Sequence, residues 1–313
     1  MRVLFWGTPD FAVPSLRALD GEGFDVVGVV TQPDRPAGRG RHMKPSAVKE
    51  LALDRGFEVL TPERPSDDEF LEAIRALQPE VSVVVAYGHI LKPEVLAIPR
   101  LGSINVHASL LPALRGAAPI HWAISRGLEE TGVTVMRMVE AMDAGAIIHQ
   151  VREPIASDET ATELTIRLSY LGAEALIEAL VLIGGGQADE VEQDHDAATY
   201  APKVGRDTAR IVWDRSNREV AAHVRAMDSL PGAWSELNGS RVKLYRPSVV
   251  APNEAENVET PGTVLATDVD HGVRVMTGEG GVSFAEVQPP GRRRMSAADW
   301  INGRSVETGQ RFV

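Results

Sequence analysis

The chain has 313 residues and a formal net charge of −12, and its content of 43% hydrophobic and 24% charged residues is typical of a folded globular protein. It contains no cysteine, which excludes disulfides, cysteine-bound metals and thiol nucleophiles and favours a reducing, cytoplasmic compartment. No stretch approaches the roughly 18 uninterrupted apolar residues of a membrane span, and at about one domain per 150 residues the length predicts two domains.

Short apolar runs alternate with helix-like segments over the first half of the chain. Strands are predicted at 2–6, 25–31, 57–60, 81–86, 102–107, 132–138 and 145–151, and helices at 11–20, 45–55, 67–77, 118–126 and 160–183. Strand–helix alternation implies right-handed crossovers, so we expect an α/β fold with a doubly wound, mostly parallel sheet.

The second half has a different pattern. The predicted helix 160–183 ends at three glycines, 184–186, and the polar stretch 187–206 is typical of a linker. A short amphipathic helix is predicted at 217–227, followed by β-rich runs at 241–247, 261–267, 272–277 and 281–287. These runs predict a small barrel or sandwich. We therefore divide the chain into a domain at 1–186, a linker at 187–206 and a domain at 207–313.

The connection after the second predicted strand, residues 33–45, is long, basic and rich in glycine and proline. Its basic side chains are Arg35, Arg39, Arg41 and Lys44, whereas residues 155–196 hold ten acids against a single basic residue. Such connections usually have about 2–6 residues. One interpretation is a solvated surface loop, and the other is an arm that contacts the phosphates and bases of a nucleic acid. Composition alone leaves both open.

Three polar residues are candidates for catalysis. Asn105 and His107 lie two positions apart at the end of the fifth predicted strand, so on a strand they point to the same side, at the edge where doubly wound sheets bind ligands. Asp143 lies in the turn between the sixth and seventh predicted strands. An amide, an imidazole and a carboxylate can together hold and polarise a carbonyl group and take a proton from the group that attacks its carbon. The alternative is a capped strand end, a buried histidine and an ordinary turn aspartate.

Two common nucleotide-binding signatures are absent. Gly7 follows the first predicted strand, but the Gly-x-Gly-x-x-Gly fingerprint is missing, which argues against a nicotinamide cofactor. The P-loop lysine pattern is missing too, so the use of a nucleoside triphosphate has no support.

Taken together, these motifs resemble those of the folate-dependent formyltransferases. The segments that carry the resemblance are Asn105-x-His107, SLLP at 109–112, Asp143, TQPDRPAGRG at 31–40 and RGAAPI at 115–120, with further similar segments from 7–12 to 294–299. The last two motifs resemble the members of that family that act on methionyl-tRNA. The similarity extends over essentially the whole chain.

This resemblance implies formyl transfer from 10-formyltetrahydrofolate to the α-amine of methionine on initiator tRNA, by a monomer without a metal or a membrane. It also implies a Rossmann-like N-terminal domain and a smaller C-terminal β-barrel related to the oligonucleotide-binding (OB) fold, which helps to hold the tRNA.

The resemblance also assigns roles to individual residues. Asn105 would hydrogen-bond the formyl oxygen, His107 would stabilise the tetrahedral intermediate, and Asp143 would pair with His107 and manage the proton of the amine. Folate contacts would be Ser109, Leu110, Leu111 and Pro112, with main chain at Tyr87 and Gly88. Contacts to tRNA would be Arg35, Arg39, Arg41 and Lys44, with Arg39 probing the acceptor end.

Two other functions fit parts of the same pattern. A sugar or nucleotide-sugar N-formyltransferase would share Asn105, His107 and Asp143, but a small acceptor does not need the basic segment 35–44. A non-catalytic tRNA- or folate-binding protein would have no reason to keep all three polar groups.

Overall fold

The computed structural model describes residues 1–37, 42–250 and 260–313, and the chain folds into two compact units. The first unit comprises 1–116, 130–154 and 165–201, and the second comprises 117–129, 155–164 and 202–313. The two units are thus interleaved along the chain. Residues 187–201, which the sequence analysis assigned to a linker, pack within the first unit.

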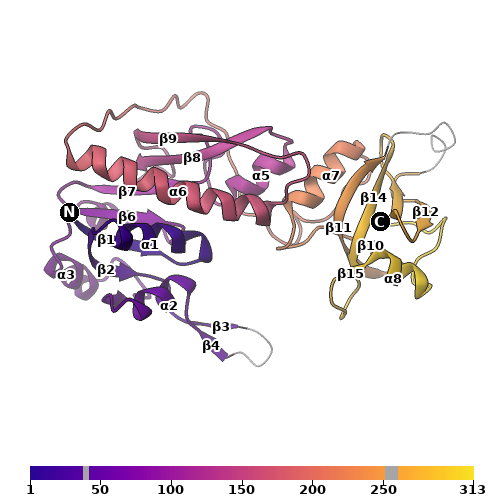
Figure 1. Cartoon of the computed structure of the whole chain (residues 1–313), viewed down its shortest axis with the longest axis horizontal. Coiled ribbons are helices and arrows are strands. Elements are labelled where there is room, and N and C mark those ends of the chain that lie inside the picture. The colour runs from indigo at the N-terminus through magenta and orange to yellow at the C-terminus, as the bar shows by residue number, and fades with distance from the viewer. Residues whose placement is uncertain (38–41, 251–259) are drawn as a thin grey trace. The chain divides into compact units, whose positions relative to one another are not determined.

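A seven-stranded sheet with the order β5-β2-β1-β6-β7-β8-β9 forms the centre of the first unit (Figure 1). Its strands are β1 (Arg2–Gly7), β2 (Asp25–Val30), β5 (Val59–Leu60), β6 (Val81–Val85), β7 (Ser103–His107), β8 (Glu130–Arg137) and β9 (Ile147–Pro154). Neighbours from β5 to β7 pair in parallel, and β8 pairs antiparallel with β7 and β9. The expected mostly parallel sheet is confirmed.

The helices of this unit follow the predicted alternation. They are the 3-10 helix η1 (Asp10–Ala12), α1 (Val13–Gly21), α2 (Ala47–Asp54), α3 (Asp68–Ala76), α4 (Pro93–Leu96) and α6 (Ala161–Gly184), which belongs to this unit from Thr165 onward. The sequence did not predict α4, because one turn of helix is too short to show a 3.6-residue period.

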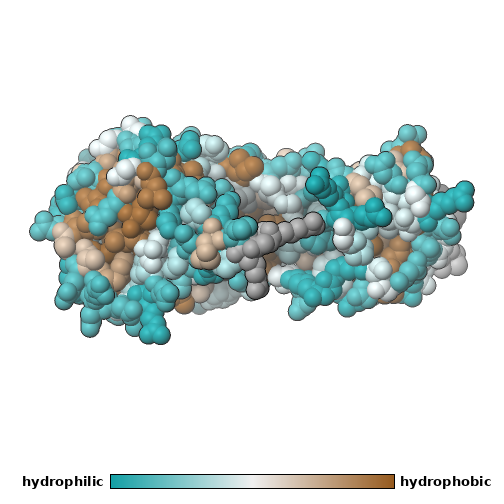
Figure 2. Space-filling model, turned by 90° about the horizontal axis from the view of Figure 1, so that it is seen from below, coloured by the Kyte–Doolittle hydropathy of each residue, from teal (hydrophilic) through white to brown (hydrophobic). Residues whose placement is uncertain are grey.

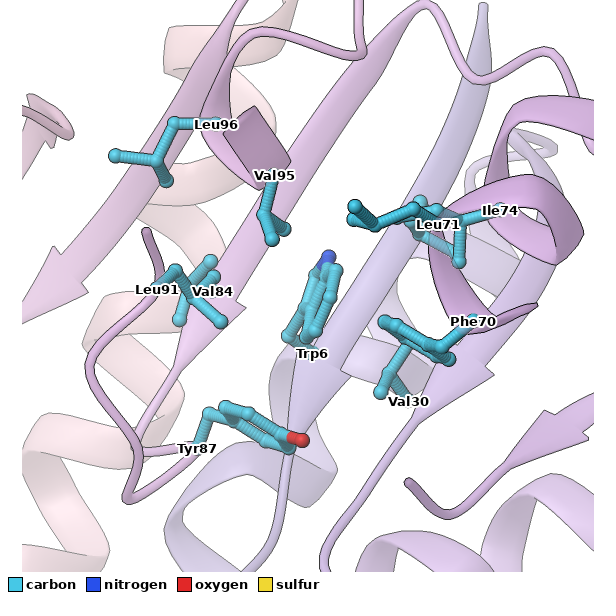
Figure 3. Close-up of a cluster of buried hydrophobic side chains, with 11 residues drawn as sticks. Trp6, Val30, Phe70, Leu71, Ile74, Val84, Tyr87, Leu91, Val95 and Leu96 are labelled. Atoms are coloured by element: carbon cyan, nitrogen blue, oxygen red, sulfur yellow. The ribbon is translucent and has the colours of Figure 1, made fainter. Parts of the chain in front are cut away.

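One face of the sheet packs on an aromatic core (Figure 3). The Trp6 ring of β1 makes edge-on contacts with Phe70 of α3, at 5.8 Å between centroids, and with Tyr87 after β6, at 5.2 Å. The indole Nε1 donates a hydrogen bond to Ser82 Oγ at 3.2 Å. Both β1 and β6 are buried along nearly their whole length, as expected for central parallel strands covered on two faces.

The second unit contains a six-stranded antiparallel sheet with the path β10-β11-β14-β13-β12, and β15 pairs with β14. Its strands are β10 (Trp234–Leu237), β11 (Ser240–Val250), β12 (Val264–Asp268), β13 (Gly272–Met276), β14 (Gly281–Gln288) and β15 (Met295–Ser296), and its helices are α5 (Pro119–Ser125), α7 (Asn217–Ala226) and α8 (Ala297–Asn302). The four predicted β-rich runs correspond to β11 to β14. The sequence did not predict β10, β15 or α8.

Residues near the C-terminus close this sheet. Phe312 bridges Leu237 of β10, and Arg311 bridges Thr263, which directly precedes β12. Both edges of the sheet are thereby paired, which makes it a barrel and removes the open edges that a sandwich would leave.

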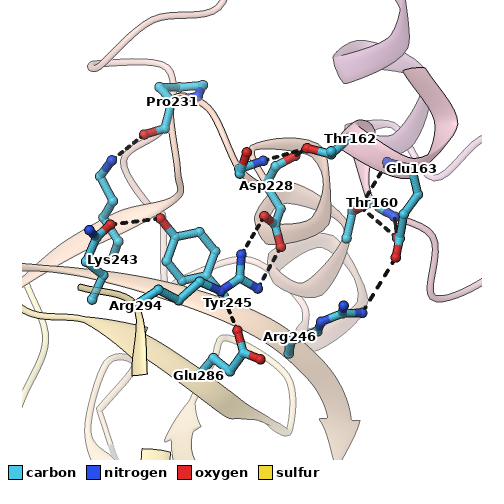
Figure 4. A network of polar contacts seen from close by, with 12 residues as sticks. Thr160, Thr162, Glu163, Asp228, Pro231, Lys243, Tyr245, Arg246, Glu286 and Arg294 are labelled. Carbon is cyan, nitrogen blue, oxygen red and sulfur yellow. Dashed lines mark hydrogen bonds and ion pairs between the residues drawn. The ribbon is translucent and has the colours of Figure 1, made fainter. Parts of the chain in front are cut away.

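Of the three arginines at 292–294, Arg294 is bound to side chains of its own unit (Figure 4). The Arg294 guanidinium donates to both carboxylate oxygens of Asp228, at 2.9 and 3.1 Å, pairs with Glu286, and lies 3.9 Å from the ring centroid of Tyr245. Burial opposes its charge, but the bonds to the two carboxylates raise the pKa of Arg294 above its ordinary value. The other two arginines of the run are exposed.

Polar residues cover most of the face seen in Figure 2, with apolar residues gathered mainly over the first unit at the left. Among the helices of the described residues, none combines the length and the apolar character needed to cross a bilayer.

The packing of the Phe312 ring predicts a large stability effect for Phe312→Ala. The Phe312 ring is 1% exposed and its centroid lies 5.6 Å from that of Trp213 in the barrel core. Truncation should lower the free energy of unfolding of this unit by about 3–5 kcal/mol, measured by denaturant titration with tryptophan fluorescence. The control Val313→Ala, at a 54% exposed side chain, should change it by less than about 0.5 kcal/mol. Equal stabilities of the two variants would contradict the contribution of the Phe312 ring to the barrel core.

Candidate active site

Two candidate residues lie at the carboxyl end of β7, where the parallel part of the sheet meets the antiparallel part. Asn105 pairs with Val84 of β6 on one side and with Met136 of β8 on the other, and His107 pairs with Thr134 of β8. Side chains two apart on a strand point to the same face. His107 is 6% exposed, and Asn105 is half-buried.

Both ring nitrogens of His107 face a protein oxygen. Nε2 lies 3.0 Å from the carbonyl oxygen of Leu114, which can only accept, so Nε2 carries the hydrogen. Nδ1 lies 3.8 Å from Asp143 Oδ2, which is beyond hydrogen-bond distance but within reach of an ion pair. The structure therefore brings together His107 of β7 and Asp143 of the turn between β8 and β9. It leaves Nδ1 as the nitrogen without a direct hydrogen bond to the described protein.

The Asp143 carboxylate is held in place by main chain. Its Oδ2 accepts the N–H of Gly116 at 2.7 Å, and its side chain is 15% exposed. Its φ of +52° lies in the left-handed region, which aspartate tolerates better than most residues. One carboxylate oxygen thus faces both a backbone donor and the imidazole.

The segment 114–116 supplies both of these main-chain contacts. Leu114 has a left-handed φ of +61°, and its N–H donates to Thr199 Oγ1 at 2.9 Å. Gly116 has a φ of +119°, and a Cβ at this position would lie 2.8 Å from the carbonyl oxygen of Ala201. Position 116 therefore requires glycine on two grounds, backbone conformation and space.

Most of the polar groups and side chains expected to contact folate at 109–112 are buried or already hydrogen-bonded within the protein. Ser109 is fully buried, and its hydroxyl donates to the carbonyl of Ala113 at 2.6 Å. Leu111 is 3% exposed, and its N–H and C=O bond to Thr134 Oγ1 at 3.1 Å and to Gln150 Nε2 at 3.1 Å. The side chains of Leu110 and Pro112 are half-buried and remain the part of this motif that a ligand can touch.

Tyr87 points into the protein rather than out of it (Figure 3). Its side chain is 1% exposed, its hydroxyl has no hydrogen-bond partner among the described residues, and burial raises its pKa to about 12. Its carbonyl accepts from Thr8 Oγ1 at 2.9 Å and from Gln32 Nε2 at 3.2 Å. Because these two bonds occupy the Tyr87 carbonyl, a ligand contact here would involve other main-chain groups. Gly88, the next residue, has a φ of +90°.

The basic segment differs from the loop that the sequence predicted, because its ends pair as a hairpin. Strands β3 (Arg35–Ala37) and β4 (His42–Lys44) are antiparallel, with Arg35 opposite Lys44, and both of these basic residues are exposed. Arg35 Nη2 donates to Gln32 Oε1 at 2.6 Å, and Gln32 in turn donates to Tyr87. The hairpin is thereby anchored beside the end of β6. Arg39 and Arg41 lie outside the described residues.

Two buried residues beside the site were not among the candidates. Arg115 and Gln193 are each 5% exposed and bond to one another, with Gln193 Oε1 at 2.6 Å from Arg115 Nη2. No local sequence signal marks them as partners, since they are 78 positions apart and Gln193 lies in a polar stretch. Within the described parts of the chain, no group of three or more acidic or histidine side chains is placed to hold a metal ion.

Comparison with known proteins gives consistent matches. Residues 1–180 match the family model described as formyl transferase, and residues 203–305 match the formyl transferase C-terminal domain. The methionyl-tRNA formyltransferase of Symbiobacterium thermophilum is 46% identical over 312 residues, covering 100% of this chain and 95% of that protein.

Two solved structures share the fold at low identity. HypX from Aquifex aeolicus in complex with tetrahydrofolic acid has a TM-score of 0.63 and 22% identity, and the match covers 96% of this chain and 47% of that longer one. An N-formyltransferase from Helicobacter canadensis, in complex with folinic acid and dTDP-3-aminofucose, has a TM-score of 0.67 and 18% identity and covers 94% of this chain and 99% of that one.

The geometry at position 116 predicts that Gly116→Ala is destabilising. The new methyl group would collide with the Ala201 carbonyl, and the φ of +119° is strained for any side chain. The free energy of unfolding of the first unit should fall by about 1–3 kcal/mol or more, measured by urea titration. Gly21→Ala is the control, because a Cβ there meets nothing within 4 Å and no unusual φ is required. A smaller loss for Gly116→Ala than for Gly21→Ala would rule out this account.

Proposed function

Because this chain belongs to the formyl transferase family, we propose that it transfers a formyl group from 10-formyltetrahydrofolate to the α-amine of methionine esterified to initiator tRNA. The identity of 46% to a methionyl-tRNA formyltransferase, over the whole of this chain, supports the tRNA acceptor. The family uses folate-derived donors, and the folate complex of a protein with this fold is consistent with that class of donor. The observation that carries the chemistry is the convergence of His107 and Asp143 at the end of β7.

Attack of the amine on the formyl carbon forms a C–N bond and a tetrahedral oxyanion, which needs hydrogen-bond donors. In the proposed mechanism the Asn105 amide supplies one donor. Because Nε2 of His107 is already bonded to Leu114, the histidine donor toward the oxyanion is a protonated Nδ1. The Asp143 carboxylate, 3.8 Å away, compensates the charge of that imidazolium. A single donor of this kind contributes about 3–4 kcal/mol to the transition state in systems where one has been removed.

Proton balance then assigns a second role to Asp143. The attacking amine loses one proton as the new amide forms, and the folate N10 gains one as its bond to the formyl carbon breaks. Asp143 is the carboxylate beside His107, and its second oxygen has no hydrogen-bond partner among the described residues, so it can take the proton from the amine. No covalent enzyme intermediate is needed for this exchange.

The two units are proposed to divide the work. The first unit, which contains Asn105, His107 and Asp143, carries the formyl-transfer site, and the barrel within 207–313 assists in binding the tRNA. Translation initiation with formylated methionyl-tRNA would place the protein in the cytoplasm. The exposed Arg35 and Lys44 of the β3–β4 hairpin, with Arg39 and Arg41 between them, are the proposed phosphate contacts.

A direct assay tests this function. Radiolabelled formyl transfer from 10-formyltetrahydrofolate is measured with charged initiator tRNA and, in parallel, with an amino-sugar nucleotide as acceptor. Transfer to the tRNA alone is expected. Transfer to the sugar alone would replace the proposed acceptor, and binding of folate or tRNA without transfer in a single turnover would exclude an enzyme.

His107→Ala and Asn105→Ala should each lower kcat by about 10²–10³-fold, because each removes one donor to the oxyanion. The affinity for charged tRNA, measured by filter binding, should change little, since neither side chain is proposed to contact the tRNA backbone. His149→Ala, at a histidine of the same unit that pairs with Glu178, is the control and should retain kcat. Near-normal turnover of either site variant would show that the site is assigned to the wrong residues.

Arg39→Ala should raise KM for tRNA and leave KM for the folate donor unchanged. If the arginine contacts a phosphate, the slope of log affinity against log salt concentration should fall by about 1. Arg17→Ala, at an exposed arginine of α1, serves as the matched control. An unchanged rate at limiting tRNA would remove this residue from the tRNA site.

A further inference from the structure

Gln193 is exceptional in its surroundings. Residues 184–200 are all described, and every one of them is exposed or half-buried except Gln193, which is 5% exposed. A buried carboxamide must have its donors and acceptor satisfied, because each unsatisfied group costs about 1–3 kcal/mol. The hydrogen-bond partners of Gln193 therefore indicate the role of its side chain.

Both amide hydrogens of Gln193 bond to the turn that carries Asp143. Nε2 donates to the carbonyl of Asp143 at 2.9 Å and to the carbonyl of Gly145 at 2.7 Å. The side chain thus holds the backbone on either side of Ala144.

The carbonyl oxygen of Gln193 bonds to a different part of the chain. Oε1 accepts from Arg115 Nε at 3.1 Å and from Arg115 Nη2 at 2.6 Å. The Arg115 guanidinium is buried and has no ion-pair partner among the described residues. Its Nη2 also lies 3.0 Å from His195 Nδ1. One carboxamide therefore joins residue 115 to the turn 143–145.

The residues on either side of Arg115 are the two that contact the catalytic pair. Leu114 binds the His107 ring through its carbonyl, and Gly116 binds the Asp143 carboxylate through its N–H. Fixing Arg115 against the turn consequently fixes both of these contacts relative to one another.

We propose that Gln193 is a positioning residue for formyl transfer, which sets the place of the Asp143 carboxylate beside His107 by tying the 143–145 turn to residue 115. This inference rests on the proposed function for its kinetic consequence. Displacement of a reacting group by about 1 Å can cost about 100-fold in rate, so the effect belongs in kcat rather than in substrate affinity.

Two variants of similar size separate the two halves of the contact. Gln193→Met removes every hydrogen bond and fills the space. Gln193→Glu keeps an acceptor for Arg115 but places an oxygen against the two turn carbonyls. Both should lower kcat by about 10–100-fold with little change in either KM, and Gln187→Ala, at an exposed glutamine of the same unit, should not. Wild-type kcat in Gln193→Glu would overturn the proposal and assign the side chain to Arg115 alone.

A double-mutant cycle distinguishes positioning from general stability. If Gln193 acts through Asp143, Gln193→Met should add less than about twofold to the loss already caused by Asp143→Asn. A full additional loss in the Asp143→Asn background would overturn the proposal, because the effect would then not pass through the carboxylate.

Amide hydrogen exchange supplies a readout independent of activity. The N–H of Gly116 is bonded to Asp143 Oδ2, so its exchange should accelerate in Gln193→Met while the amides of β1 and β6 keep their protection. Unchanged protection at Gly116 would overturn the proposal. If the wild-type protein transfers no formyl group at all, the proposed function fails, and this measurement alone then decides whether Gln193 holds the turn.

Discussion

Three consecutive residues, 114–116, constrain the whole candidate site. One carbonyl of this segment orients the His107 ring and one N–H orients the Asp143 carboxylate. The spacing of a side chain from β7 and one from the turn after β8 is therefore set by a single piece of backbone. The segment adopts two left-handed conformations in three residues, at Leu114 and Gly116, and a left-handed leucine costs about 1–3 kcal/mol. Bonds to Thr199 and Ala201 offset that strain, and they join residues 187–201 to the first unit.

The sequence predicted the sheet and the placement of Asn105 and His107 for physical reasons that are visible locally. Central strands are continuous apolar runs because both faces are covered, and the carboxyl ends of neighbouring parallel strands meet at one edge. That rule does not place Asp143, because β8 is antiparallel to β7 and its carboxyl end lies beside the start of β7. The position of Asp143 beside His107 is instead held by its bond to the Gly116 N–H. The sequence could not predict that a buried amide and a buried guanidinium meet at 193 and 115. Tertiary contacts decide whether a polar residue in a polar stretch is buried, and the local sequence pattern does not predict it.

Some motif residues in this protein bond within the fold and turn away from the surface. Ser109 and Tyr87 belong to the segments that resemble the family, yet the Ser109 hydroxyl bonds to its own loop and the Tyr87 ring packs on Trp6. Arg294 shows the same in the barrel, where a residue of a basic run is bound to carboxylates of its own unit. A side chain can be essential to a motif because it shapes the surface that a ligand meets, without touching the ligand.

The pairing of Phe312 and Arg311 with the two outer parts of the barrel has a consequence for synthesis on the ribosome. A chain emerging from N- to C-terminus exposes β10 and the region of β12 well before the segment that joins them exists. Until then each presents a row of unpaired backbone groups, which are templates for aberrant strand addition and aggregation. Interrupted translation or proteolytic cleavage near residue 310 would leave the backbone groups of these edges unpaired and prone to aggregation.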